Sequence, residues 1–243
     1  MSSYLENVNS VTLANTTFKN KSNIVSVDLV GTSWVNNSMQ EAFQNCSSLT
    51  SVTNINNSVT NMKRTFENCT SLVTAPNIPN SVTDMYGTYR NCTSLTTVPN
   101  IPYNVTDMYE TFSGCTNLVT PPALSSRATD LSGCFQDCTS LTTAPSIPYT
   151  TDSLASTFWN CSSLTTAPTI PSSVTSMVSC FTGCTNLTGD IYISSSNVSW
   201  AYNCFDNTSL TKRVHVPANS TTRNSFIAAG YDNAGTKNGV ILV

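Results

Sequence analysis

Residues 91–103 read NCTSLTTVPNIPY, and two close copies follow, DCTSLTTAPSIPY at residues 137–149 and NCSSLTTAPTIPS at residues 160–172. The cysteine of this stretch recurs every 23 residues, at Cys46, Cys69, Cys92, Cys115, Cys138, Cys161 and Cys184. An aromatic residue stands three positions before each of these cysteines, and a leucine stands three positions after each. One short unit is therefore repeated many times along the chain.

The repeat extends beyond the seven cysteines in both directions. Phe18 and Ile24 keep the pattern upstream, and Phe205 and Leu210 keep it downstream with a one-residue change in spacing. About nine units result, and a fixed period of this length is typical of a leucine-rich-repeat solenoid. The sequence predicts an N-terminal segment at residues 1–10, a solenoid at 11–211 and a C-terminal cap at 212–243.

Each unit is predicted to contain a short helix and a short strand, which makes the fold an α/β solenoid. Apolar residues are spaced like the buried face of a helix, as at Val82, Met85, Tyr89 and Cys92. Ser81 and Asp84 resemble a capping box at its start. The run LTTVPNIP, residues 95–102, indicates a strand that ends at proline. Because strands stack about 4.8 Å apart and helices about 8–10 Å apart, we expect a curved stack with its strands on the concave side.

The composition excludes several classes of partner. Only 9 % of the residues are charged, and 10 Lys and Arg against 13 Asp and Glu give a net charge of -3. A nucleic-acid backbone or an anionic membrane surface would require a basic patch, which this composition does not offer. No apolar run is long enough for membrane insertion. The N-terminus carries no recognisable secretion signal.

The cysteines favour a packing role. The seven repeat cysteines lie on the apolar stripe of each unit, where a thiol packs as a small hydrophobic group, although stacked neighbours are close enough for disulfides. Cys180 and Cys204 lie outside this series, on adjacent units, and they are the one pair that we consider for a disulfide bond. The chain has no paired-cysteine motif for zinc and one histidine, His215, so we expect neither a metal nor another cofactor.

An enzyme is not expected either. His215 lies in an extended run, RVHVP, without a second histidine or a recognisable nucleophile motif. The acidic series Asp84, Asp107 and Asp130 is interpreted as residues at helix N-termini, favoured by the helix dipole. A calcium or general-acid role for these aspartates is the alternative.

Residues 212–243 leave the repeat. TTRNSFIAAG, residues 221–230, reads as a helix that ends at Gly230, and GVILV, residues 239–243, reads as a strand. Solenoids need terminal caps to cover the apolar edge of the last unit, so we predict a cap. A docking element for a larger assembly is the alternative.

Aromatic and threonine side chains outside the core pattern are the candidate binding residues. Rigid aromatic rings stack on sugars and anchor protein interfaces, and a regular threonine array also raises ice binding as a remote alternative. The candidates are Tyr86, Tyr109, Trp159, Tyr103 and Tyr149, with the threonine series Thr74, Thr97, Thr120, Thr143 and Thr166.

The segments TFSGCTNL (111–118), CFQDCTSL (134–141) and CFTGCTNL (180–187) resemble the repeats of BspA-like leucine-rich repeat surface proteins. The resemblance covers roughly residues 11–216. It implies a leucine-rich-repeat solenoid in a surface or secreted protein that acts in adhesion. Similar repeats occur in phage tail and fibre proteins and in protist surface proteins.

Together these observations predict a non-enzymatic recognition or structural protein. With no visible export signal, and with Met1 taken as its start, we expect a phage virion component, in a tail, fibre or decoration. Its partners are then a host-surface glycan or protein, or neighbouring virion proteins. The alternative is a bacterial adhesin of the BspA-like type, at the cell surface or secreted. The sequence leaves the oligomeric state open.

Overall fold

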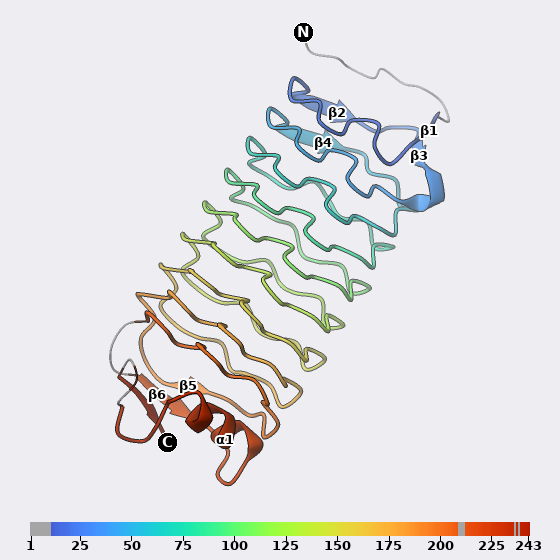
Figure 1. The fold of residues 1–243 in the computed structure, drawn as a ribbon. Coiled ribbons are helices and arrows are strands. Elements are labelled where there is room, and N and C mark those ends of the chain that lie inside the picture. Colours follow the sequence, from blue (N-terminus) through green and yellow to red (C-terminus); the bar gives the residue numbers. More distant parts are fainter. Residues whose placement is uncertain (1–10, 209–211, 236, 238) are drawn as a thin grey trace.

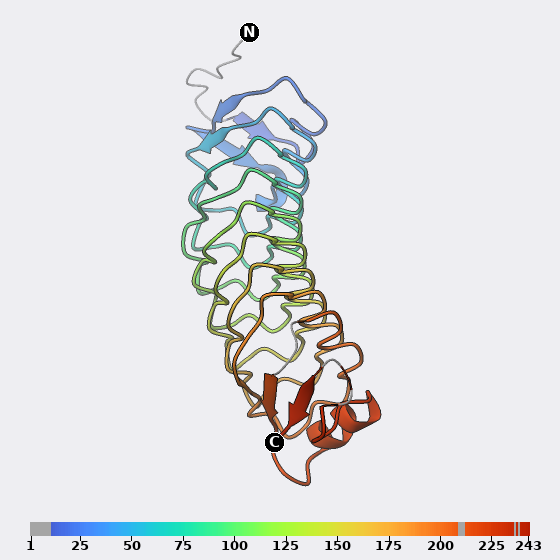
Figure 2. The same cartoon turned by 90° about the vertical axis from the view of Figure 1, so that its left-hand side faces the viewer.

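The computed structural model describes residues 11–208, 212–235, 237 and 239–243, and it shows an elongated stack of similar coils (Figure 1). Equivalent residues of successive coils lie side by side in both views, with each coil next to its neighbours in the sequence (Figure 2). The predicted repeat solenoid is therefore confirmed. No helix in the described part of the chain is both long and apolar enough to cross a bilayer.

Regular elements are short and lie near the two ends of the stack. They are β1 (Val11–Leu13), β2 (Ser26–Asp28), β3 (Thr32–Trp34), the 3₁₀ turn η1 (Val35–Asn37), β4 (Ser51–Thr53), β5 (Ile191–Tyr192), β6 (Lys212–His215), α1 (Thr221–Ala228) and β7 (Val240–Leu242). Strand β1 pairs with β3, β2 pairs with β4, and β5, β6 and β7 form a three-stranded sheet. All of these pairings are parallel. For β1–β3 and β2–β4 this is expected, because equivalent segments of repeated units stack.

Between these ends, the segment after each repeat leucine pairs only briefly with the next unit. Thr74 pairs with Thr97, and Thr143 pairs with Thr166, through isolated parallel bridges. The pairing is brief because the prolines that follow have no N–H to donate. We call this surface the strand side: residues 50–53, 73–75, 96–98, 119–121, 142–144 and 165–167.

The predicted helix is wrong, because consecutive β-turns replace it in the described units. Segments 85–88 and 89–92 each close with a hydrogen bond from the fourth N–H to the first carbonyl. The third residues of these turns, Gly87 and Asn91, have φ of 56° and 58°, which an α-helix does not contain. We call this surface the turn side: residues 38–46, 61–69, 84–92, 107–115, 130–138, 153–161 and 176–184.

The residues predicted to begin that helix have other roles. The Ser81 hydroxyl donates to the Val59 carbonyl of the preceding unit. The Asp84 carboxylate accepts the N–H of Tyr86, and the backbone of Asp84 lies in a parallel bridge to Asp107. Asp84 and Asp107 therefore stabilise turns, and they do not lie at the N-termini of helices as predicted.

The absence of repeat helices also removes the expected cause of curvature. Backbone N–H groups of the turn side donate directly to the next unit, as from Met85 to Asp107 and from Gly87 to Tyr109. The turn side therefore advances by a hydrogen-bonded spacing, as the strand side does, rather than by the wider spacing of packed helices. Figure 1 accordingly shows a nearly straight stack, not a strongly curved one.

The core is built around one column of aromatic rings. Neighbouring rings from Phe43 to Phe205 stack nearly parallel, with centroids 5.4–5.8 Å apart. The column comprises Phe18, Phe43, Phe66, Tyr89, Phe112, Phe135, Phe158, Phe181, Phe205 and Phe226. No unit buries its ring alone, so identical positions must recur in every unit.

The seven repeat cysteines, which we call the ladder cysteines, are buried thiols beside this column and form no disulfides among the described residues. Each thiol donates to the carbonyl oxygen of the aromatic residue in the preceding unit, over 3.0–3.2 Å. Cys180 and Cys204 are also buried and free. Cys134 and Cys180 occupy the position where other units bury a threonine, such as Thr111 and Thr157.

The C-terminal end of the stack meets α1 and the three-stranded sheet (Figure 1). Helix α1 lies where the sequence predicts a helix, and the Ser220 hydroxyl caps it by accepting the N–H of Arg223. Phe226 of α1 stacks on Phe205 with centroids 5.9 Å apart. Leu210 and the predicted segment 1–10 lie outside the described residues.

Candidate functional site

The predicted binding residues fall on three different sides of the stack. Tyr86, Tyr109 and Trp159 lie on the turn side, and the series Thr74, Thr97, Thr120, Thr143 and Thr166 lies on the strand side. Tyr103 and Tyr149 lie on a third surface, which we call the proline side: residues 54–58, 76–80, 99–103, 122–126, 145–149 and 168–172. The structure therefore does not bring them together into one site.

The ring of Tyr86 is occupied by contacts within the protein. It stacks on Tyr109, with centroids 4.9 Å apart and planes 16° from parallel. The Lys63 ammonium lies 4.4 Å from the centre of the same ring. Because residues 63, 86 and 109 are equivalent in successive units, the lysine and Tyr109 approach Tyr86 from opposite directions. Stacking and cation–π contacts then leave neither face of this ring open to a ligand.

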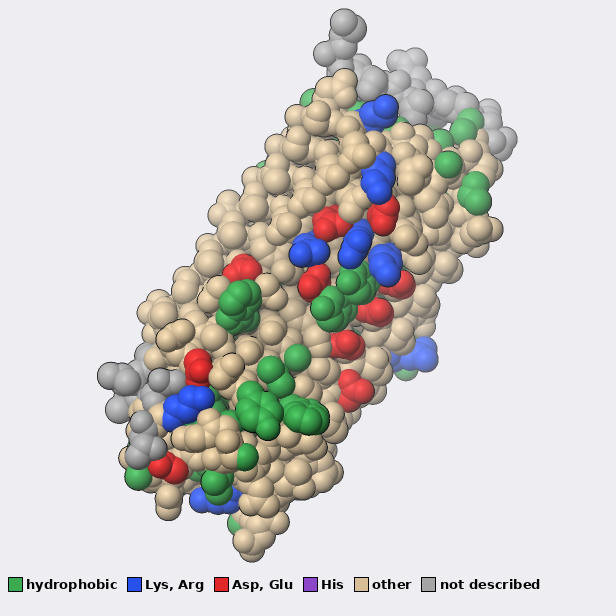
Figure 3. Space-filling view, in the orientation of Figure 1, with side chains coloured by type: hydrophobic (Ala, Val, Ile, Leu, Met, Phe, Trp, Pro, Cys, Tyr) green, Lys and Arg blue, Asp and Glu red, His purple; other side chains and the backbone are tan. Residues whose placement is uncertain are grey.

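Ion pairs gather along the N-terminal half of the turn side, and all of them except Arg64–Glu67 bridge neighbouring units. The pairs are Lys19–Glu41 at 2.6 Å, Arg64–Glu67 at 3.8 Å, Arg90–Glu67 at 3.5 Å and Arg90–Glu110 at 3.4 Å. Figure 3 shows basic, acidic and hydrophobic side chains gathered in a band along one face of the stack. Each cation of these pairs meets a carboxylate, so they do not form a basic patch for a polyanion.

Carboxylates also line up near the middle of the turn side. Parallel bridges connect Asp84 to Asp107 and Asp107 to Asp130. Burial raises the pKa of Asp107, and the negative charges of Asp84 and Asp130 raise it further. The Asp107 carboxylate accepts the N–H of Tyr109, which opposes the rise. The repulsion between the three aspartates is thus unfavourable, and the hydrogen bond to the N–H of Tyr109 partly offsets it at Asp107.

The C-terminal half of the turn side carries a pocket around Trp159. Its volume is about 400 Å³, and Gln136, Thr182, Asn203 and Asp206 are among the residues that line it. Gln136, Trp159 and Thr182 occupy the same position in three successive units. That position holds Glu67 and Arg90 in the charged half, so the pocket forms where the ion pairs end.

The backbone holds Trp159 firmly in this pocket. Its N–H donates to the Ser156 carbonyl, and its own carbonyl accepts the N–H of Asp137. Ser156 and Asn160 on either side have φ of 54° and 57°, so the tryptophan lies between two left-handed residues. Phe158, the preceding residue, is fully buried in the aromatic column. The backbone of Trp159 is therefore held in place, and its indole is partly buried at the pocket.

The charge of Asp206 at the rim of the pocket is balanced from the C-terminal segment. Its Oδ1 atom accepts the hydroxyl of Tyr231 over 3.1 Å and lies 3.0 Å from the Lys237 ammonium. The same Tyr231 hydroxyl accepts the N–H of Phe205. The pocket therefore presents mainly amide and hydroxyl groups around an aromatic ring, which suits an uncharged hydroxyl-rich ligand.

The two tyrosines of the proline side are highly exposed. Tyr103 is 66 % exposed and Tyr149 is 85 % exposed. Tyr149 lines a groove of about 440 Å³, and the Arg127 guanidinium lies 5.5 Å from the centre of the Tyr103 ring.

The predicted threonine series is exposed along the strand side. A second exposed column runs beside it, in which Thr96, Thr142 and Thr165 donate their hydroxyls to carbonyls of the preceding unit. Those hydroxyls stabilise the stack. Ice binding by the strand side stays a prediction.

His215 has the contacts of a structural residue. Its Nε2 atom lies 2.8 Å from Asp190 Oδ2, and its ring stacks on Tyr192 with centroids 4.5 Å apart. Among the described residues, no three His, Cys, Asp or Glu side chains are grouped as a metal site would require.

Comparison with known proteins identifies the repeat. A family profile described as "BspA type Leucine rich repeat region" matches residues 4–119 and 131–228 in six copies. Among curated proteins, no sequence match was found. Sequence reasoning found the repeat itself but not the Trp159 pocket, which depends on side chains from several units.

Solved structures share the fold at low sequence identity. A leucine-rich repeat protein from Bacteroides ovatus is 21 % identical, with a TM-score of 0.57 over 96 % of this chain and 64 % of that chain. This chain therefore spans less than two thirds of that relative. A leucine-rich repeat protein of T. pallidum is 16 % identical, with a TM-score of 0.38 over 95 % of this chain and 80 % of that one. A leucine rich cell surface protein from Faecalibacterium prausnitzii is 17 % identical, with a TM-score of 0.42 over 95 % and 82 %.

The first of these likenesses supports a leucine-rich-repeat fold, in agreement with the stack described above. The family match covers most of the sequence, and its repeat is the one that stacks the aromatic and cysteine columns. The chain belongs to the BspA-type leucine-rich repeat family.

Proposed function

We propose that this protein is a non-enzymatic, adhesin-like recognition protein that binds a neutral surface glycan through the Trp159 pocket. Membership of the BspA-type family favours the cell-surface alternative over the virion component that the sequence first suggested. The family supports the surface role, and the residues of the Trp159 pocket support a glycan as the ligand.

The Trp159 pocket carries the proposal because it combines the two contacts that sugars require. The indole offers a flat apolar surface for the C–H face of a sugar ring. The amides of Gln136 and Asn203 and the hydroxyl group of Thr182 line the same pocket. The Thr182 hydroxyl donates to the Asn203 carbonyl and the Gln136 amide donates to Asp137, and both side-chain oxygens can still accept from sugar hydroxyls. A volume of about 400 Å³ is within the usual range for a small ligand.

Binding of the purified protein to an array of neutral glycans tests this proposal. We expect Trp159→Ala to weaken binding at least tenfold, which corresponds to about 1.4 kcal/mol. Trp159→Phe should retain most of the affinity, since it keeps an aromatic face. Raising the salt concentration should change the affinity little, unlike the steep loss expected for a phosphate polymer.

Trp200→Ala is the matched control, because Trp200 is an exposed tryptophan, 56 % accessible, that does not line the pocket. It should bind like the parent protein. Equal losses in both variants would contradict a site at Trp159, and so would a parent protein that binds no neutral glycan.

Immunogold labelling of producing cells tests the cellular location separately. Label on the cell envelope is expected. Label confined to phage particles would overturn the surface assignment and restore the virion interpretation, whatever the glycan experiment shows.

A further inference from the structure

We infer that the proline side carries a second, repeating binding site that takes an extended neutral polysaccharide. It shares its ligand class with the proposed function, but it uses other residues on another side of the stack. Failure at one site therefore leaves the other to be judged by itself.

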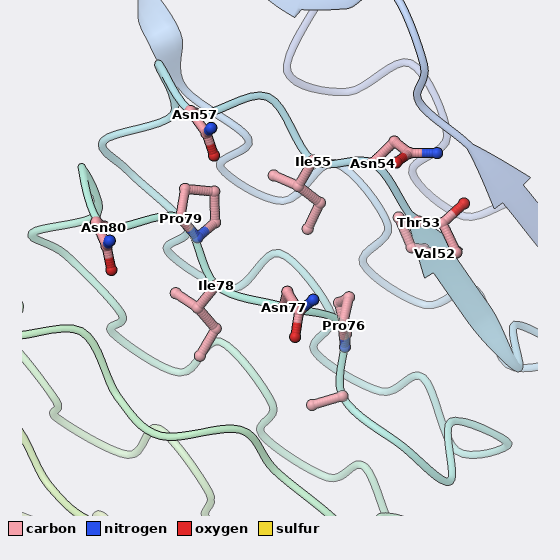
Figure 4. Close-up of a pocket in the computed structure, with 11 residues that line it drawn as sticks. Val52, Thr53, Asn54, Ile55, Asn57, Pro76, Asn77, Ile78, Pro79 and Asn80 are labelled. Carbon is pink, nitrogen blue, oxygen red and sulfur yellow. The ribbon is translucent and has the colours of Figure 1, made fainter.

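One groove of the proline side lies between the units at residues 52–57 and 75–80. Its volume is about 700 Å³. Ile55, Ile78 and Pro79 lie near its centre, and Asn57 and Asn80 lie together at one end (Figure 4). The groove thus combines aliphatic side chains with terminal amides.

Two further grooves continue this pattern along the stack. Grooves of about 350 and 440 Å³ share Ala144, Pro145 and Ser146. One extends from there to the unit at residues 120–124, and the other to Pro168 and Pro171. These two grooves form one trough that crosses three successive units, so a ligand lying along the stack meets similar groups in each of these units.

Proline is the physical cause of these grooves. Ala75 donates its N–H to Thr97 of the next unit, but Pro76 and Pro79 have no N–H to donate. The hydrogen-bonded ladder is interrupted where these prolines stand. Adjacent units are therefore not drawn together there, and the space between them remains open at the surface.

The lining chemistry points to hydroxyl groups as partners. The side-chain amides of Asn57, Asn77 and Asn80 are exposed and have no hydrogen-bond partner among the described residues. An amide both donates and accepts, as a sugar hydroxyl does. None of the described charged side chains lines any of the three grooves, so these residues offer no charge complementary to a polyanion or a polycation.

A peptide fits these grooves less well. Addition of a strand needs a row of free backbone N–H and C=O groups, which the prolines interrupt. Recognition of a proline-rich helix uses grooves lined by several aromatic residues, and among the described residues Tyr149 is the one aromatic residue that lines any of the three grooves. A polysaccharide needs neither feature, because its hydroxyls meet the amides and its C–H groups meet the aliphatic side chains.

Affinity electrophoresis of the full chain tests the inference, with gels that contain a soluble β-glucan, a galactomannan or an α-glucan. We expect at least one of these neutral polysaccharides to retard the protein. Ser146→Arg places a long side chain at the exposed residue shared by two grooves, and it should reduce the apparent affinity at least tenfold. Asn77→Ala with Asn80→Ala should weaken binding in the first groove several-fold. A hexasaccharide of the retarding polymer should compete at least tenfold better than its disaccharide.

Asn117→Ala with Asn186→Ala is the control, since both asparagines are exposed and line none of the three grooves. Circular dichroism confirms that each variant is folded, and Trp159→Ala should be retarded like the parent.

No retardation by any of the three polymers, or undiminished retardation of the folded Ser146→Arg variant, overturns the inference. So does equal competition by disaccharide and hexasaccharide. Capture of a poly-L-proline peptide that Ser146→Arg abolishes, without retardation by polysaccharide, would assign the trough to peptides instead.

Discussion

The ring of Tyr89 stacks on that of Phe112 with centroids 5.7 Å apart and planes 4° from parallel, and the tyrosine hydroxyl is buried without a hydrogen-bond partner among the described residues. Phenylalanine fills this position in the neighbouring units. The hydroxyl therefore loses its hydration on folding and gains nothing in return.

Tyr89→Phe should stabilise the protein. Removing the unpaired hydroxyl should raise the free energy of unfolding by about 1 kcal/mol, or about 2–4 °C in Tm for a chain of this size. Tyr231→Phe is the matched control and should lower Tm, because the Tyr231 hydroxyl bonds both Phe205 and Asp206. Thermal unfolding followed by circular dichroism measures both, and a lower Tm for Tyr89→Phe would mean that the hydroxyl has a partner in solution.

The ladder thiols should be unreactive in the folded protein. Burial raises the pKa of Cys92 and Cys115 far above the ordinary thiol range, and the thiolate is the reactive form. We expect slow reaction of native protein with a thiol reagent at pH 8. Denatured, unreduced protein should titrate at least seven of the ten cysteines, whereas fewer than four would indicate disulfides between units.

Asp107→Asn should stabilise the protein at neutral pH. The pKa of Asp107 is raised in the folded state, so the folded protein loses stability as pH rises from the ordinary aspartate pKa, near 4, through the raised value. Asparagine removes this loss and still accepts the turn N–H, as Asn61 does at the equivalent position.

The expected gain in Tm for Asp107→Asn is about 1–2 °C at pH 7, allowing for the solvent that still reaches this carboxylate. At pH 3 the gain should vanish, because aspartate is then protonated in both states. A gain of the same size at both pH values would show that charge is not its cause.

Tyr86→Ala should reduce stability rather than binding. The variant loses the stack on Tyr109 and the contact with Lys63, which together contribute about 1–2 kcal/mol. Glycan binding should stay at the level of the parent protein, while Trp159→Ala shows the reverse. A folded Tyr86→Ala variant that loses attachment to cells would place the binding surface on the charged half of the turn side.

Deleting residues 212–243 should expose the end of the aromatic column. Phe205 would lose its stacking partner Phe226 and the edge contact with Tyr231, and exposed apolar surface of this kind promotes association. We expect aggregation, or fraying of the last units, in size-exclusion chromatography and hydrogen exchange. A monomeric truncation with unchanged melting would favour the docking role over the cap.

The period, the core and the strand side follow from the sequence, because they depend on residues that recur in one frame. The turn side does not, because β-turns that close every three or four residues space apolar side chains much as a helix does. Gly87 and Asn91, both in the left-handed region, were the available signal, since glycine and asparagine in mid-segment favour turns. The pocket at Trp159 and the trough at Ser146 depend on how neighbouring units sit, which one unit's sequence does not define.

The N–H of Met85 points to the carbonyl of Asp107 in the next unit, and bonds of this kind join every pair of described neighbouring units along the stack. Tension applied end to end therefore loads a few bonds of the outermost unit at a time rather than the whole ladder at once. A unit that opens releases roughly 80 Å of extended chain at about 3.3–3.6 Å per residue. In the surface role proposed above, such a chain would lengthen in steps under tension and could refold when the tension relaxes, so attachment need not fail at the first strong force.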